Sequence, residues 1–404
     1  MSTHNFAFVV GDFERIFSQR SHLISMYFPK DPNHDATWAV EVAEYGIEYM
    51  DNMFDSRYPL LKLDMVAIPD IAGSIGNWGL ITCGMDVLSD RESPLCVDKV
   101  SVAEEVLRVV CYSWFSSIVT MKSWKSYWFE DAFATLISCL VLDTLPCGKG
   151  VWPQFVAQTM QGALELDALQ STHAVEMQIS EAVRATEAYD NLSCMKGSCL
   201  LRMISHHIGK DNFEKGIRLY LENYCMQTVN PDYFWMCLER SSRRPVREFM
   251  AVWTSKPGFP LITVSVERQL EVAGTHVGFD LVLQKTRYFS SPTEQDHEDS
   301  IDYPIWLAIR IHGRIKRYLF PRKEIVIRLK NTHFYKINVD HCGFYRTTYP
   351  QPTLERFALQ STANELTASD KAGIVADATA LCFSGHQSTV GLLALLLNMR
   401  EEPD

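Results

Sequence analysis

The hydrophobic period of the chain changes at Ser255-Lys-Pro-Gly-Phe-Pro260, and this change limits the folds that the chain can adopt. Before the break, apolar residues recur at the three- and four-residue spacing of amphipathic helices, most clearly from about Val100 to Leu145. After it they alternate, as in Leu261-Ile-Thr-Val-Ser-Val266, which predicts strands. Helices followed by strands predict an α+β protein with more than one domain.

Further elements follow from the same two periods. Helices are expected at about 35–54, 152–169, 187–208, 212–224 and from 351 to the carboxyl end. Strands are expected at 6–10, 61–69, 78–82, 277–283, 305–311, 314–320 and 325–329. His312-Gly313 reads as a hairpin turn, and the acidic stretch at 290–300 as a loop within the β region.

Composition excludes some classes of protein. The net charge of -11 leaves no basic stripe for nucleic acid. The amino terminus lacks the basic and apolar regions of a signal peptide. The longest pure apolar run, Leu392–Leu397, is too short to span a membrane. The eleven cysteines are scattered without CxxC spacing, so we expect free thiols in a reduced compartment, the cytoplasm.

Arg108-Val-Val-Cys-Tyr112 and Asp131 lie on two predicted helices with the spacing of a metal site. In a His-Glu-x-x-His helix, histidines four residues apart clamp zinc and the glutamate polarises the metal-bound water. A carboxylate from a neighbouring helix completes such a site. In this chain the corresponding positions hold Arg108, Val109, Tyr112 and Asp131. The two helices of such a site, called the helical frame below, are therefore expected, but Arg108 and Tyr112 are not the histidine ligands that zinc requires.

Motifs along essentially the whole chain resemble those of the M1 zinc aminopeptidases, in the style of the fungal alanine/arginine aminopeptidases. The segments that carry the resemblance are Tyr58–Asp70, Asn77–Thr82, Trp114–Phe133, Trp253 with Gly258–Pro260, Gly343–Arg346 and Asp370–Asp377. The resemblance implies four parts. These are the last strand of an amino-terminal β domain at 1–12, a thermolysin-like (gluzincin-type) peptidase domain at 13–256, a β-sandwich at 257–350 and a truncated helical domain at 351–404.

The resemblance also implies which chemistry is missing. Arg108 and Tyr112 stand at the two histidine ligands, Val109 at the general base and Asp131 at the third ligand. The family binds zinc, but no cofactor is expected in this chain. In Gly73-Ser-Ile-Gly-Asn77, Gly76 stands at the glutamate that holds the substrate's amine. Cys194 stands at the tyrosine that stabilises the oxyanion, where a thiol is a weak donor.

Three functions stay open. The leading hypothesis is a non-catalytic M1-like pseudopeptidase with a binding or scaffolding role. Its partner would be an unknown protein or a second copy of the chain, bound through surfaces that the missing domains would otherwise cover. Nucleic acid and membrane are not expected as partners. The second is an enzyme that acts on a small molecule in the old cleft, with Arg108, Tyr112, Glu130 and Asp131 as its polar cluster. The third is a residual metallo-aminopeptidase that removes amino-terminal residues from peptides.

We expect Arg108 to form an ion pair with Asp131, with the Tyr112 hydroxyl nearby and Glu130 as the alternative acid. Other polar residues have plainer interpretations. Glu104 and Glu105 are expected at a solvated helix edge, and Cys194 as a buried thiol. His206-His207 is expected to be an ordinary helix-end pair, because adjacent helical residues face different ways and the sequence offers no third ligand.

Overall fold

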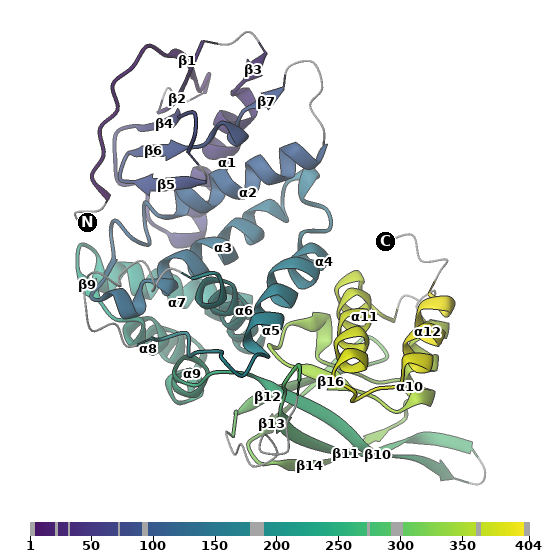
Figure 1. Ribbon diagram of the computed structural model, residues 1–404. Coiled ribbons are helices and arrows are strands. Elements are labelled where there is room, and N and C mark those ends of the chain that lie inside the picture. Colours follow the sequence, from purple (N-terminus) through teal and green to yellow (C-terminus); the bar gives the residue numbers. More distant parts are fainter. Residues whose placement is uncertain are drawn as a thin grey trace. The chain divides into compact units, whose positions relative to one another are not determined.

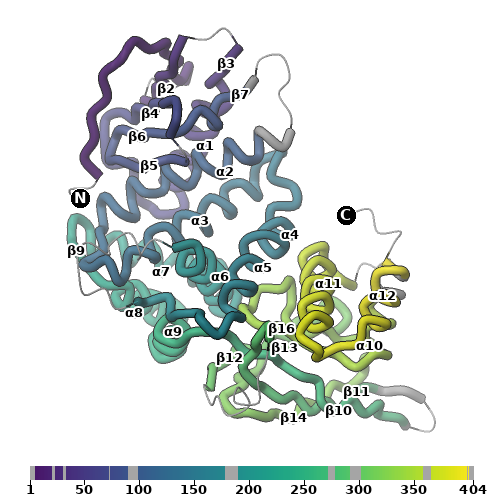
Figure 2. The backbone as a smooth tube through the Cα atoms, in the orientation of Figure 1, coloured from purple at the N-terminus to yellow at the C-terminus, as the bar shows by residue number. Residues whose placement is uncertain are grey.

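The computed structural model describes residues 5–20, 23–30, 33–71, 73–90, 96–177, 190–272, 275–291, 302–360 and 365–399. Backbone contacts divide the chain into two units (Figure 1, Figure 2). The first unit holds the described residues up to Val151 and from Ile208 to Arg247. The second unit holds the described residues from Trp152 to Met177, from Asp190 to His207 and from Glu248 onward.

The first unit contains a five-stranded mixed sheet. In spatial order, its strands are β1 (Glu14–Phe17), β2 (Ile24–Phe28), β4 (Leu63–Ala67), β6 (Leu80–Cys83) and β5 (Ser74–Asn77). The three inner strands run parallel to one another, and each edge strand runs antiparallel to its neighbour. Strand β4 is mostly buried, as its apolar sequence predicts. Two further short pairs are β3 (His34–Asp35) with β7 (Ser89–Asp90) and β8 (Thr120–Met121) with β9 (Thr228–Val229).

Helices make up the rest of the first unit: α1 (Thr37–Phe54), α2 (Cys96–Cys111), α3 (Trp128–Leu142), α7 (Lys210–Tyr224) and α8 (Pro231–Ser242). Helix α2 packs against both α1 and α3 (Figure 1). Aromatic rings fill the core beside α3, where Phe115 stacks on Phe133 with ring centroids 3.7 Å apart. Trp114 and Trp128 are also buried, whereas Trp124 is 42% exposed.

The second unit combines helices with two sheets. One sheet has the strand order β14-β11-β10-β16 and the other β13-β12-β15. The strands are β10 (Pro260–Val272), β11 (Thr275–Arg287), β12 (Ile305–Ile311), β13 (Arg314–Phe320), β14 (Glu324–Lys330), β15 (Lys336–Ile337) and β16 (Arg346–Thr348). His312 and Gly313 form the predicted turn between β12 and β13, with φ angles of 44° and 68°.

The helices of the second unit are α4 (Val151–Phe155), α5 (Gln161–Asp167), α6 (Asn191–Ile208), α9 (Val246–Ser255), α10 (Gln351–Gln360), α11 (Ala368–Phe383) and α12 (Thr389–Asn398). A π-helical turn at Val156–Met160 joins α4 to α5. Helix α11 begins with a capping box, in which Thr367 and Asp370 each bind the other's backbone N–H.

The elements differ from the sequence predictions in several places, and strands β1, β2 and β5 are among those not predicted. Residues 6–10 form no strand, and Phe6, Phe8 and Val10 are 72%, 83% and 92% exposed. Within the described residues, no strand pairs with residues 6–10 and nothing covers their large side chains, so the predicted strand is wrong. Helices α8 and α9 were not predicted, and β10 and β11 are longer than expected. Most of the acidic stretch at 290–300 lies outside the described residues.

The mixed α/β architecture is as predicted at the coarse level, and the domain boundaries predicted after residue 12 stay a prediction. The ten cysteines whose side chains are described form no disulfide bond with one another. Among the described residues, no helix is both long and apolar enough to cross a membrane.

Candidate functional site

Arg108, Tyr112 and Asp131 meet where α2 packs against α3. Arg108 lies in the last turn of α2, and Tyr112 follows directly after its last residue, Cys111. Residues four apart at a helix end lie on the same side of it. Asp131 lies in the first turn of α3 and faces this side. The structure therefore brings together three of the positions that the sequence marked as a candidate site.

Hydrogen bonds join these three side chains. Arg108 Nη1 donates to Asp131 Oδ1 at 2.9 Å and to the Tyr112 hydroxyl at 2.8 Å. The Tyr112 hydroxyl in turn donates to Asp131 Oδ1. The predicted ion pair between Arg108 and Asp131 is thus present, with the Tyr112 hydroxyl beside it.

Glu105, which was expected at a solvated edge, is a fourth member of this network. Arg108 Nη2 donates to Glu105 Oε1 and Oε2 at 2.8 and 2.9 Å, and Arg108 Nε donates to Oε2 at 3.0 Å. The Glu105 side chain is only 23% exposed, so the expectation was wrong. The signal that could have found it is its three-residue spacing from Arg108 on one helix. Glu105, Arg108, Tyr112 and Asp131 are called the Arg108 cluster below.

The Arg108 cluster is a partly buried, charge-assisted network. The side chains of Arg108 and Asp131 are 18% and 10% exposed. Burial alone would lower the pKa of Arg108, but the neighbouring Tyr112, Asp131 and Glu105 outweigh it and raise the pKa above its usual range. The guanidinium therefore stays charged and neutralises one of the two carboxylates. Its planar fork binds both oxygens of Glu105 while Nη1 reaches Asp131, a geometry that a lysine ammonium does not offer.

Of the two candidate acids on α3, Asp131 forms the ion pair and Glu130 binds elsewhere. The Glu130 carboxylate accepts a hydrogen bond from the Met121 backbone N–H at 2.9 Å. Glu130 is 4% exposed, and this burial raises its pKa to about 7, although hydrogen bonds from Met121 and Ser116 act in the opposite direction. Glu130 is therefore a buried acid that titrates near neutral pH.

The ring of Tyr112 lies directly against the backbone of Gly76 in β5. A Cβ atom at Gly76 would lie 2.3 Å from Tyr112 Cδ2 and 2.9 Å from Tyr112 Cβ, far inside van der Waals contact. Helix α2 and strand β5 pack together at this point. Only glycine fits at position 76 while a tyrosine occupies position 112, so the two predicted site residues are sterically linked.

The remaining predicted positions offer little chemistry of their own. Val109 lies on α2 with 2% of its surface exposed, and its aliphatic side chain has no group that can exchange a proton. Cys194 lies in the first turn of α6 in the second unit and is only half-buried, so it is more exposed than expected.

The Arg108 cluster does not offer the donors that a zinc ion needs. Zinc sites in proteins use three or four ligands from cysteine, histidine and carboxylate side chains. A protonated guanidinium cannot ligate a cation, and only Glu105 and Asp131 of the four residues carry a ligand of this kind, which is too few. Within the described residues, the one group of three potential metal ligands lies elsewhere, at His206, Asp340 and Cys342.

Comparisons with known proteins match nearly the whole chain. The model of the peptidase family M1 domain matches residues 38–253, and the model of the ERAP1-like C-terminal domain matches residues 334–404. The alanine/arginine aminopeptidase of Saccharomyces cerevisiae is 33% identical over 100% of this chain and 46% of its own length. Aminopeptidase M1-D of Oryza sativa subsp. japonica is 32% identical over 100% of this chain and 47% of its own length. The chain thus spans about half the length of the curated relatives it matches.

Proposed function

This chain belongs to peptidase family M1, the family that its motifs predict, and we propose that it is a member without the family's catalytic zinc site and without peptidase activity. In this proposal Arg108, Val109 and Tyr112 stand at the family's His-Glu-x-x-His positions, and Asp131 at its third ligand. The Arg108 cluster then replaces the metal as the link between α2 and α3.

The single observation that carries the proposal is the contact between Arg108 Nη1 and Asp131 Oδ1 at 2.9 Å. The carboxylate that would ligate a metal is instead paired with a permanent cation from the opposite helix. Expelling that cation to admit zinc would leave a partly buried guanidinium without its partner, which is strongly unfavourable. The cluster is therefore a closed, internally satisfied network.

The contact between Tyr112 and Gly76 gives independent support. In the family pattern, a glutamate at position 76 would hold the substrate's free amine. Gly76 has no side chain, and the Tyr112 ring covers its backbone so closely that a Cβ atom would clash at 2.3 Å. The substitutions at the two positions therefore reinforce each other, and a substrate amine has neither a carboxylate nor free space at this point.

The side chains at the positions of the general base and the oxyanion donor cannot perform those two roles. Valine at position 109 cannot accept a proton from water, and the Cys194 thiol is a poor substitute for a tyrosine hydroxyl. Loss of one preorganised oxyanion donor alone lowers kcat about 10²- to 10³-fold. Together with the loss of metal and base, this predicts no measurable aminopeptidase turnover.

The proposal includes three of the four predicted parts, a peptidase-like domain at 13–256, a β-sandwich at 257–350 and a helical domain at 351–404, and not the strand at 1–12. The family matches at 38–253 and 334–404 support it. It also includes a binding or scaffolding role, through a protein partner or self-association. Large exposed apolar side chains on α12 support that role: Val390, Leu393, Leu396 and Leu397.

An activity assay tests the proposal. The full chain, with and without added zinc, is incubated with a panel of aminoacyl fluorogenic substrates that includes alanine and arginine. We expect no turnover above the background of the Asp131→Ala variant. Turnover that depends on zinc and disappears in Asp131→Ala would overturn the proposal. Zinc-independent turnover of another small molecule, lost in Arg108→Ala, would instead favour the repurposed enzyme.

A further inference from the structure

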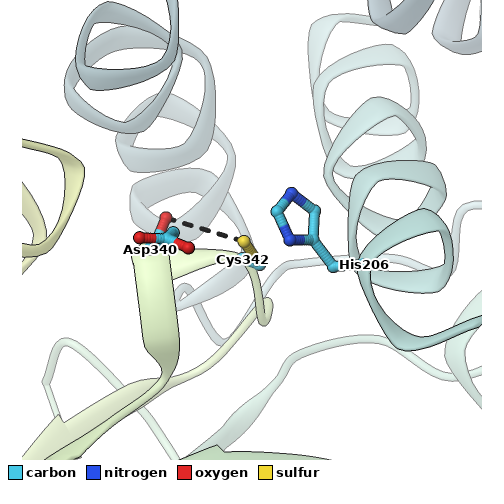
Figure 3. Close-up of side chains that lie close together, drawn as sticks. All are labelled: His206, Asp340 and Cys342. Carbon is cyan, nitrogen blue, oxygen red and sulfur yellow. Dashed lines mark hydrogen bonds between the residues drawn. The ribbon is translucent and has the colours of Figure 1, made fainter. Parts of the chain in front are cut away.

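Three side chains of the second unit that are far apart in the sequence converge outside the Arg108 cluster. His206 lies in the last turn of α6, and Asp340 and Cys342 follow β15. One ligand atom from each residue lies within 4.8 Å of the others. Figure 3 shows the His206 imidazole with one edge toward the Cys342 sulfur, and Asp340 on the other side of that sulfur. The neighbouring His207 stacks on Trp306, with ring centroids 3.5 Å apart.

The backbone that carries Asp340 and Cys342 is held in an unusual conformation. Asn338, Asp340 and His341 all adopt left-handed φ angles, of 64°, 53° and 49°. Such angles are uncommon for residues other than glycine and persist only where the surroundings fix them. Arg202 does so by donating hydrogen bonds to the carbonyl oxygens of His341 and Asp340, each at 3.0 Å. The two side chains are therefore presented from a rigid segment.

The cluster opens to a small cavity. The cavity has a volume of about 40 Å³, and its lining includes His206, Asp340 and Cys342 together with Met203, Trp306 and Arg317. That volume holds an ion with a water molecule. His206 is exposed, Cys342 is buried, and both line the cavity, so the cavity connects solvent with the sulfur.

The charges around the cavity set conditions on what can bind. Asp340 Oδ1 accepts hydrogen bonds from Arg310 Nη2 and from Thr367 Oγ1, which fix the carboxylate and engage this one oxygen. Arg317 lines the cavity, and its positive charge repels a cation. A bound cation therefore needs a second negative ligand besides Asp340, which the Cys342 thiol supplies once it has lost its proton. A zinc ion causes this loss of the proton outright.

We propose that His206, Asp340 and Cys342 bind one zinc ion, with the fourth coordination position open to the cavity. Nitrogen, oxygen and sulfur donors together match the ligand set of zinc and not that of magnesium or calcium. Zinc bonds of about 2.0–2.3 Å need the ligand atoms roughly 1 Å closer than 4.8 Å. The exposed His206 side chain is the one that moves. The site lies in the second unit and goes beyond the proposed function.

Cobalt titration of the full chain tests this proposal directly. Chelator-treated protein is titrated with Co²⁺ and then with Zn²⁺. We expect one equivalent of Co²⁺, a near-ultraviolet thiolate-to-cobalt charge-transfer band, and loss of that band when Zn²⁺ displaces the cobalt. This readout needs no variant, so it does not depend on whether a substituted protein folds. A wild-type titration with neither a charge-transfer band nor bound metal would overturn the proposal.

Variants assign the ligands. Loss of a residue that only orients a metal ligand costs metal affinity about 10- to 100-fold, so removal of a ligand itself in Cys342→Ser or His206→Ala should cost at least about 100-fold. Cys225→Ser and His173→Gln serve as matched controls and should bind as the wild type does. Affinity unchanged in Cys342→Ser would contradict the assignment. Because these residues lie outside the Arg108 cluster, zinc that is lost in Cys342→Ser leaves the proposed function intact.

Discussion

Arg108 Nη1 lies 2.9 Å from Asp131 Oδ1, so a single ion pair joins the last turn of α2 to the first turn of α3. Formation of such a pair adds little net stability, because desolvation of both charges offsets their attraction. Its disruption is costly, because one charge is then left partly buried and unpaired. The pair therefore fixes how the two helices meet more than it adds to the stability of the fold.

Removal of the cation should destabilise the protein. Arg108→Met leaves the carboxylates of Glu105 and Asp131 close together without a counter-charge, so we expect a loss of about 3 kcal/mol in the free energy of unfolding. Urea denaturation measures this loss. As the control, Lys30→Met removes an exposed partner of Asp12 and should have little effect. Equal losses in the two variants would show that the Arg108 cluster is no more than a surface pair.

The steric link between Gly76 and Tyr112 predicts a rescue. Gly76→Ala places a methyl group 2.3 Å from the Tyr112 ring, and we expect a loss of about 1–3 kcal/mol from overpacking. In a Tyr112→Ala background the same substitution should be nearly neutral. The double-mutant cycle, measured by thermal or urea unfolding, gives the coupling directly. Additive losses would mean that the ring does not occupy this position.

The buried Glu130 predicts a pH dependence. Burial raises its pKa from 4.5 to about 7, so the folded state binds this proton more tightly than the unfolded state does. The stability that Glu130 contributes is present below about pH 4.5 and is lost as the pH rises through 7. Glu130→Gln keeps an oxygen for the Met121 N–H and removes the titration. Its stability relative to the wild type should therefore rise between pH 5 and pH 8, by on the order of 3 kcal/mol. A constant difference would contradict the shift.

The helical frame should accept a restored metal site. Arg108→His, Tyr112→His and Asp131→Glu together place three zinc donors on the retained spacing. We expect the triple variant to bind one zinc with a dissociation constant of about 10⁻⁷ M or tighter, as structural zinc sites do. The measurement is made in a Cys342→Ser background by competition with a chromogenic chelator. Peptidase activity should stay absent, because Val109, Gly76 and Cys194 are unchanged. Failure to bind zinc in a folded triple variant would mean that the frame has moved.

The sequence predicted the frame of the site because helical spacing is a local property. Helix periodicity places Arg108 and Tyr112 on one side of α2, and the contact with Asp131 was expected because the resemblance to the M1 family puts all three residues at its metal-ligand positions. Glu105 was missed although its spacing from Arg108 is also local, because a paired acid and a solvated acid look alike in sequence. The tight contact between Tyr112 and Gly76 depends on how α2 meets β5, which no periodicity encodes.

Longer-range features were beyond the sequence for physical reasons. His206 gains Asp340 and Cys342 as neighbours through left-handed backbone angles at non-glycine residues, which residue type does not signal. Residues 6–10 alternate like a strand, but alternation supplies no partner to pair with, and their large side chains stay exposed. The longer strands of the second unit were predicted from alternating apolar residues, which in β12 coincide with alternating burial, whereas β15 and β16 are too short to show a period.

Zinc content measured in a Cys342→Ser/His206→Ala background tests the central claim most directly. This background removes the site proposed in the second unit, so any remaining zinc reports on the rest of the chain. Mass spectrometry of purified, zinc-saturated and desalted protein should find no stoichiometric zinc, because the Arg108–Asp131 ion pair stands where a metal would bind. One zinc per chain that disappears on Asp131→Ala would contradict the account.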